Sequence, residues 1–127
     1  MSVKVVDASA IAAVLLEESS ADAIQARIAG QQLTGPMILG FEFCNVCVVK
    51  ARRYPEKRDI FREALDVFHS MAIWMQAISA ADVFILTERH TLSAYDASYL
   101  WLALELDAEL VTLDAKLERA YAALARS

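Results

Sequence analysis

The chain has 127 residues, a net charge of −5 and a hydrophobic fraction of 57%. This length predicts a single domain, residues 1–127, with a sizeable core, and the acidic balance excludes strong nonspecific binding of nucleic acid over the whole surface. No apolar run approaches the roughly 18 residues of a membrane span, and the first residues lack the pattern of a signal peptide, so we expect a cytoplasmic protein without a membrane segment. The hydrophobic fraction exceeds the usual value of about 45–50%, which suggests a surface buried against a partner or a second copy.

The hydrophobic pattern predicts strands that alternate with helices. Short apolar runs rich in β-branched residues predict strands at 3–6, 31–34, 72–76 and 108–113. Longer segments with apolar faces predict helices at 8–17, 20–29, 36–53, 55–70, 79–90, 91–106 and 115–125. Pro36 and Pro55 suit the first turn of a helix, which sets the start of two of these segments. Alternation of this kind predicts an α/β fold with a parallel sheet.

Two cysteines form a C-x-x-C motif, Cys44 and Cys47, inside the helix predicted at 36–53. A zinc site needs a second pair of ligands at suitable spacing, and the two histidines, His69 and His90, are isolated from each other and from the cysteines. A thioredoxin-like motif would not lie in the middle of a helix. We therefore interpret both cysteines as small apolar core residues.

Three acids point to one edge of the predicted sheet. Asp7 directly follows the first predicted strand and Asp114 directly follows the last one. Sites in open α/β sheets lie beyond the carboxyl ends of the strands, where the strand order reverses. Asp96 lies in the first turn of the almost entirely apolar helix that feeds the last strand, so it points to the same edge. Each acid alone is also explained as a helix cap or as a favourable charge at a helix N-terminus.

Glu42 lies in the apolar segment "MILGFEFCNVCVV" and shares a helix face with Leu39, Val46 and Val49. It lies too far beyond Pro36 to act as a cap, and no Lys or Arg lies within a turn of it. A buried carboxylate must be neutral, paired or bound to a metal. A distant basic partner is one account; convergence of all four acids on one cleft is simpler. Carboxylates without His or Cys suit Mg²⁺ or Mn²⁺, and such centres drive attack of water on a phosphodiester.

Three blocks of the sequence resemble PIN-domain ribonucleases, and more narrowly the toxin of VapBC-type toxin–antitoxin pairs. They are "VVDASA", "PMILGFEFCNV" and "YDASYLWLALELDAELVTLDAKL", in that order over nearly the whole chain. The resemblance assigns the catalytic and metal-binding centre to Asp7, Glu42, Asp96 and Asp114. It also matches Ser9 and Thr112 to hydroxyl residues near the first and last acids, which are suited to orient carboxylates; for Ser9, helix capping is the alternative.

The resemblance also implies a fold, an activity and partners. The expected fold is a three-layer α/β/α sandwich around a mostly parallel sheet of four or five strands, with the first and fourth strands adjacent. Family members often add a short fifth strand, whereas this chain is expected to end as a helix. The implied activity is a Mg²⁺-dependent endoribonuclease, with Mn²⁺ as a substitute, that cuts structured RNA such as tRNA or rRNA. A cognate antitoxin and homodimer formation are implied as well.

Half of the 12 basic residues lie between Lys50 and Arg62. An exposed helix–helix junction explains them without any function. The alternative is a phosphate-contacting patch on an acidic protein. The candidate RNA-binding residues are Lys50, Arg52, Arg53, Lys57, Arg58 and Arg62.

Other functions fit the sequence less well. A receiver-type phospho-signalling domain has a similar length and a strand-end Asp, but it needs an acid pair and a Lys after its last strand. A haloacid-dehalogenase-like phosphatase needs D-x-D, and Ser9 occupies the position of the second Asp. A catalytically inactive PIN-like binding module would have lost acids, and all four are present.

Overall fold

The computed structural model describes residues 2–125. In chain order its elements are β1 (Val3–Val6), α1 (Ala8–Leu15), α2 (Ala21–Ile28), β2 (Gln32–Pro36), α3 (Leu39–Arg53), the 3₁₀ turn η1 (Pro55–Lys57), α4 (Arg58–Ser70), β3 (Trp74–Gln76), α5 (Ala80–Arg89), α6 (Ala94–Glu105), β4 (Glu109–Val111) and α7 (Ala115–Ala125). Every strand and helix predicted above is present, with shifted ends. Within the described range the chain ends as helix α7, as predicted, and the sheet has four strands.

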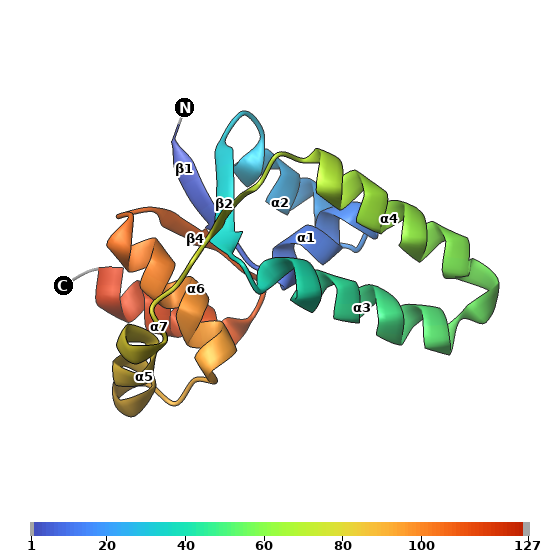
Figure 1. The fold of residues 1–127 in the computed structure, drawn as a ribbon. Helices are drawn as coiled ribbons and strands as arrows, with labels where there is room; N and C mark the ends of the chain where they lie inside the picture. The colour runs from blue at the N-terminus through green and yellow to red at the C-terminus, as the bar shows by residue number, and fades with distance from the viewer. Residues whose placement is uncertain (1, 126–127) are drawn as a thin grey trace.

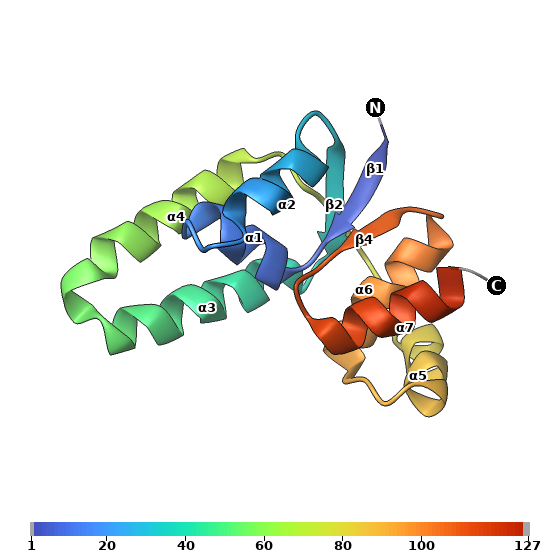
Figure 2. The same ribbon diagram turned by 180° about the vertical axis from the view of Figure 1, so that it is seen from behind.

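The strands form one parallel sheet in the order β3-β2-β1-β4. Helices α1 to α4 lie on one side of it and α5 to α7 on the other (Figures 1 and 2). The predicted three-layer α/β/α sandwich is therefore confirmed. The adjacency of the first and fourth strands is confirmed too, since Val6 pairs with Val111. Because β2 and β4 flank β1 on opposite sides, the strand order reverses between β1 and β4.

Helix α6 is the central helix of its layer, between α5 and α7 and against the sheet. It is apolar on nearly all sides, and Tyr99 and Leu100 are fully buried together with Leu110 of β4. Burial of each such side chain stabilises the fold by about 1.5–3 kcal/mol. Despite this apolar character, neither α6 nor any other helix in residues 2–125 has the length and hydropathy to cross a membrane.

The start of α3 differs from the prediction. Pro36 is the last residue of β2 rather than the first turn of a helix, and α3 begins at Leu39. Proline is tolerated at the end of this strand because the pairing of β2 with β1 ends at Thr34, so Pro36 has no partner there that needs its N–H. The next amide, that of Met37, still donates to the carbonyl of Gln76 at 3.0 Å. A Cβ on Gly35 would lie 2.8 Å from Leu39 Cδ2, so the glycine lets the first turn of α3 pack against β2. Consequently the first turn of α3 lies at the carboxyl end of the sheet.

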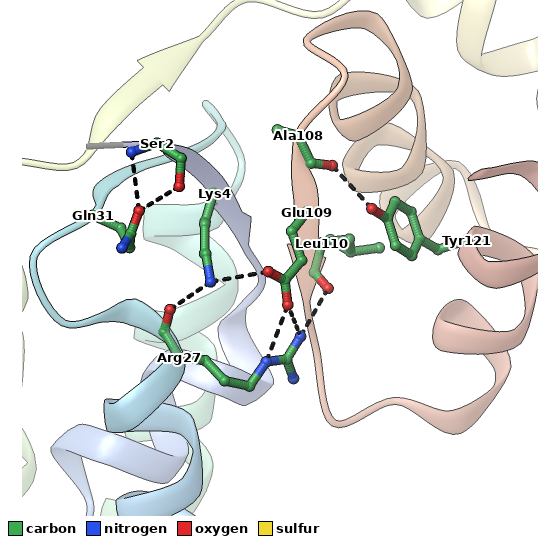
Figure 3. Close-up of polar contacts among 8 residues, drawn as sticks. All are labelled: Ser2, Lys4, Arg27, Gln31, Ala108, Glu109, Leu110 and Tyr121. Atoms are coloured by element: carbon green, nitrogen blue, oxygen red, sulfur yellow. Dashed lines mark hydrogen bonds and ion pairs between the residues drawn. The ribbon is translucent and has the colours of Figure 1, made fainter. Parts of the chain in front are cut away.

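An ion network ties the amino ends of β1 and β4 to the end of α2 (Figure 3). Lys4 Nζ lies 2.9 Å from Glu109 Oε2 and donates to the Arg27 carbonyl at 2.7 Å. Arg27 Nη2 lies 2.6 Å from Glu109 Oε1 and also donates to the Leu110 carbonyl at 3.4 Å. Hydrogen bonds from Arg27 and then Lys4 hold the pKa of Glu109 below its usual value. The pairing of β1 with β4 is thus fastened at the end opposite the predicted site.

The cysteines are both free thiols. Cys47 is buried in the core and Cys44 is half-buried. The predicted core role is confirmed for Cys47 and holds only in part for Cys44.

Candidate active site

The carboxyl ends of β1 and β4 bring Asp7 and Asp114 to the same edge of the sheet. Asp7 directly follows β1, and its backbone N–H donates to Val111 of β4 at 3.3 Å. Its Oδ1 also accepts from the Ala10 N–H at 3.0 Å, which caps α1. Asp114 lies three residues beyond the end of β4 and caps α7, because its Oδ1 accepts from the Leu117 N–H at 2.9 Å. The expected capping contacts are present at both acids, in addition to their convergence.

Two hydroxyl groups hold the Asp7 carboxylate, which is buried. Ser9 Oγ donates to Oδ1 at 2.6 Å, and Thr112 Oγ1 donates to Oδ2 at 2.5 Å. The same hydroxyls accept from the backbone N–H groups of Leu113, at 2.9 Å, and Asp114, at 3.0 Å. Burial raises the pKa of Asp7, these hydrogen bonds oppose the rise, and the charge of Asp114 adds to it. Ser9 and Thr112 therefore fix Asp7 to the segment that follows β4.

Replacement of Thr112 tests this connection. Thr112→Val keeps the shape but removes the donor to Asp7 and the acceptor for the Asp114 N–H, so we expect unfolding to become easier by about 1–3 kcal/mol. Thr112→Ser keeps the hydroxyl and should retain most of the stability. Urea unfolding at neutral pH measures both variants. If Thr112→Val is as stable as the wild type, the hydroxyl does not hold Asp7.

Glu42 lies in the first turn of α3 and is half-buried. The Tyr99 hydroxyl donates to its Oε1 at 2.5 Å, and no Lys, Arg or His in residues 2–125 forms an ion pair with it. Burial raises the pKa of Glu42, the bond from Tyr99 opposes the rise, and the charges of Asp96 and Asp7 add to it. The carboxylate thus lacks a positive partner, as the sequence suggested.

Two predictions about Glu42 were wrong. Because α3 starts at Leu39, Glu42 does occupy a helix start, where the helix dipole favours a carboxylate. The helix face that Glu42 shares with Leu39 and Val49 is also not buried along its whole length, since Leu39 is fully buried but Val49 is 55% exposed. Tyr99 was not among the predicted site residues, because it lies in a helix that is otherwise almost entirely apolar. Its position one helical turn beyond Asp96 is the signal that could have placed its hydroxyl in the site.

Asp96 is the third residue of α6 and is half-buried. Its backbone N–H donates to Ser93 Oγ at 3.1 Å, so the expected cap at the start of this helix is present. The pKa of Asp96 is raised chiefly by burial, then by the charges of Asp114 and Asp7, while the charge of Lys116 lowers it. Lys116, two residues beyond Asp114, is therefore a cation at the site, and it was not among the predicted site residues.

Asp7, Glu42, Asp96 and Asp114 form one electrostatic group, which we call the acid group. The charge of Asp114 raises the pKa of Asp7, the charges of Asp96 and Asp7 raise that of Glu42, and the charges of Asp114 and Asp7 raise that of Asp96. All four donors are carboxylates, which fits a hard divalent cation. In the conformation described for residues 2–125, however, no three His, Cys, Asp or Glu side chains are arranged so that they could hold a metal ion. Mutual repulsion favours separated carboxylates, and a divalent cation removes that repulsion.

A family model described as the PIN domain matches residues 4–123. The chain belongs to the PIN-domain family. Ribonuclease VapC3 of Pyrobaculum aerophilum is 34% identical over 94% of this chain and 95% of its own length. Ribonuclease VapC9 of Mycobacterium tuberculosis is 34% identical over 89% of this chain and 87% of its own length. Family membership excludes the receiver and phosphatase alternatives.

The fold of this PIN domain matches a solved structure as well. The crystal structure of PAE2754 from Pyrobaculum aerophilum superposes with a TM-score of 0.74 at 21% identity, over 98% of this chain and 96% of that one. The likeness supports the fold described above, including the parallel sheet and its two helical layers.

A groove of about 430 Å³ borders the acid group of the PIN domain at Glu42. Its other lining residues are Ala8, Ile38, Phe41, Asn45, Val46 and Tyr95. The six basic residues of the predicted RNA-binding patch do not share one surface. Lys50 and Arg53 line a second groove next to the first, whereas Arg58 and Arg62 line a different groove that also contains Cys47.

Proposed function

We propose that this PIN domain is a metal-dependent endoribonuclease and the toxin of a toxin–antitoxin pair. The observation that supports the activity most is the group of four carboxylates at the switch point of the sheet, with Glu42 lacking any ion-pair partner in residues 2–125. The likeness to ribonucleases named VapC, over most of both chains, supports the choice of RNA and the toxin role.

Asp7, Glu42, Asp96 and Asp114 would hold Mg²⁺, with Mn²⁺ as a substitute. When bound, the metal activates water and stabilises the charge that develops on the phosphate. The chain's own groups orient these ligands. The Ser9 and Thr112 hydroxyls fix both oxygens of Asp7, and Tyr99 holds Glu42 Oε1. Within residues 2–125 Glu42 Oε2 has no hydrogen bond or ion pair, so it can face a cation. Burial and the bond to Glu42 raise the pKa of Tyr99, so its hydroxyl keeps the proton that it donates.

We propose tRNA or rRNA as the substrate class and a cognate antitoxin as the inhibitor, acting in the cytoplasm where those RNAs lie. Purified protein should produce discrete internal cuts in total RNA with Mg²⁺ or Mn²⁺, detected by mapping of new 5′ ends. Protein with Asp96→Asn, prepared identically, excludes a contaminating nuclease. The absence of new ends with either metal, together with retained RNA binding, would instead establish an inactive binding module.

We further propose that the protein forms a homodimer. Large apolar side chains are exposed on the layer that contains α5 and at the entry to α3, including Phe84 at 65% and Met37 at 64%. Exposed apolar groups of this size favour a protein partner. The molar mass measured by light scattering during size exclusion checks this, and a monomer at micromolar concentration would contradict it.

A further inference from the structure

The groove at Glu42 does not end at the acid group. It shares Asn45 and Val46 with the second groove, of about 300 Å³, which also contains Val49, Lys50, Arg53 and Tyr54. The lining positions of α3 recur every three or four residues from Glu42 to Arg53, as expected of one face of a helix. We call this continuous surface the α3 groove. It follows the α3–α4 hairpin, which projects away from the sheet in Figure 1.

The charge of the α3 groove reverses along its length. Glu42 lies at the sheet end, and Arg53 lies about 16 Å further along the axis at 1.5 Å per residue. Lys50 and Arg53 form no ion pair with any residue from 2 to 125, so both cations are available. At the far end the Arg53 guanidinium lies 5.5 Å from the centre of the Tyr54 ring, and Lys57 Nζ lies 5.7 Å from it.

Aromatic side chains border both ends of the groove. Phe41 and Tyr95 line the acid end and are 80% and 58% exposed, and Tyr54 is exposed at the cationic end. Exposed rings beside cations are typical of surfaces that bind single-stranded nucleic acid, where bases stack on the rings and phosphates contact the cations. Bases in a duplex are stacked on each other and are not available to such rings.

We propose that the α3 groove binds single-stranded RNA that leaves the acid group, with phosphates at Lys50 and Arg53 and a base stacked on Tyr54. This inference rests on the proposed nuclease function, because a scissile phosphate at the four acids places the adjoining nucleotides in this groove. An acid group repels RNA and needs cations nearby to hold the backbone. The α3 groove adds Lys50 and Arg53 to Lys116, the cation already present beside Asp96.

The hairpin also supplies a matched control. Arg58 and Arg62 are exposed cations on the same hairpin, but they line the groove with Phe61 and Leu65, away from the α3 groove. Arg58 also lies 3.3 Å from Asp59, with which it forms an ion pair. Removal of either pair of cations changes the net charge of the protein equally, so a general charge effect and a specific contact can be separated.

The test is a titration of the full-length protein with a short fluorescent single-stranded RNA at several salt concentrations, in EDTA so that no RNA is cut. Lys50→Ala with Arg53→Ala should weaken binding by about tenfold or more and reduce the slope of log affinity against log salt by about 1.4, at about 0.7 for each phosphate that no longer meets a cation. Arg58→Ala with Arg62→Ala should keep the wild-type slope. Equal changes in both double variants, or no change in the first, would overturn the proposal.

Two further arms test stacking and strandedness. Tyr54→Phe keeps the ring and should bind as the wild type does, whereas Tyr54→Leu should bind about tenfold more weakly. Circular dichroism verifies the fold of both variants. A duplex of the same sequence should bind more weakly than the single strand. Equal affinity of the two Tyr54 variants, or a preference for the duplex, would contradict the proposed binding mode.

The outcome can be separated from that of the proposed function. If the α3 groove binds RNA as described but no cuts appear with Mg²⁺ or Mn²⁺, the nuclease function fails and the binding surface stands. If cuts appear and the Lys50 and Arg53 double variant binds RNA normally, the proposal about the α3 groove is wrong and the nuclease function stands. In that case, loss of binding to a polyglutamate peptide by the same variant would assign the groove to an acidic protein partner.

Discussion

Asp96→Asn should reduce RNA cleavage by about 100-fold or more while leaving the protein at least as stable as the wild type. Asparagine has nearly the same shape, and its backbone N–H can still donate to Ser93. The change removes one negative charge from a group in which burial, Asp114 and Asp7 already raise the pKa of Asp96. Cleavage of a defined RNA with Mg²⁺ and urea unfolding at about pH 7.5, where an unperturbed carboxyl is ionised, measure the two effects.

Helix α5 provides a matched control for this variant. Asp82 holds the same position relative to its cap, because its N–H donates to Ser79 Oγ at 3.3 Å, but it is exposed and lies outside the acid group. Asp82→Asn should therefore change neither cleavage nor stability. Near wild-type cleavage by Asp96→Asn would show that Asp96 acts only at the helix start.

Mg²⁺ should raise the melting temperature of the protein, and by more at about pH 8 than at about pH 5, because its carboxylate ligands must be ionised. The pKa values of Asp7, Glu42 and Asp96 are raised, chiefly by burial. A group with a raised pKa contributes stability that is fully present below its unfolded value, about 4 for these residues, and is lost as pH rises through its folded value. The metal-free protein should therefore lose stability with rising pH in this window. A cation that binds the folded centre at about 100 times its Kd restores about 2.7 kcal/mol.

The pH dependence caused by the acids with raised pKa values can be separated from that of Glu109. The pKa of Glu109 is lowered, so its contribution has the opposite sign: it is present above the unfolded value and lost only as pH falls through its folded value. Scanning calorimetry with and without Mg²⁺ at each pH provides the measurement. Asp96→Asn should show a flatter pH profile and a smaller Mg²⁺ effect. An Mg²⁺ effect unchanged by the loss of both Asp96 and Glu42 would place the cation elsewhere.

The part of the site at the strand ends could be predicted from sequence because it depends only on residues that are adjacent in the chain. An acid directly after an apolar strand lies at the carboxyl edge of a parallel sheet, which located Asp7 and Asp114 once β1 and β4 were taken as neighbours. The parallel sheet and the helical layers followed from the alternation of elements in the same way.

Features set by tertiary contacts were harder to predict. The start of α3 depends on β2 extending through Pro36 beside β3, which a proline alone does not signal. The contact of Tyr99 with Glu42 depends on how α6 faces α3. The separation of Lys50 from Arg62 depends on the rotation of α3 and α4 about their axes, so residues close in sequence came to lie in different grooves.

The paired strands β1 and β4 are fastened by Lys4, Arg27 and Glu109 at one end and carry mutually repelling acids at the other. Natural selection for folding alone would preserve Lys4, Arg27 and Glu109 and would tolerate substitution of the acids at the opposite end. Loss of Glu42 or Asp96 would relieve repulsion without removing any of these ties. Gene copies released from selection for toxicity should therefore lose these acids early and persist as folded, inactive proteins. The presence of the acids then indicates that a member of this lineage is still under selection as an enzyme.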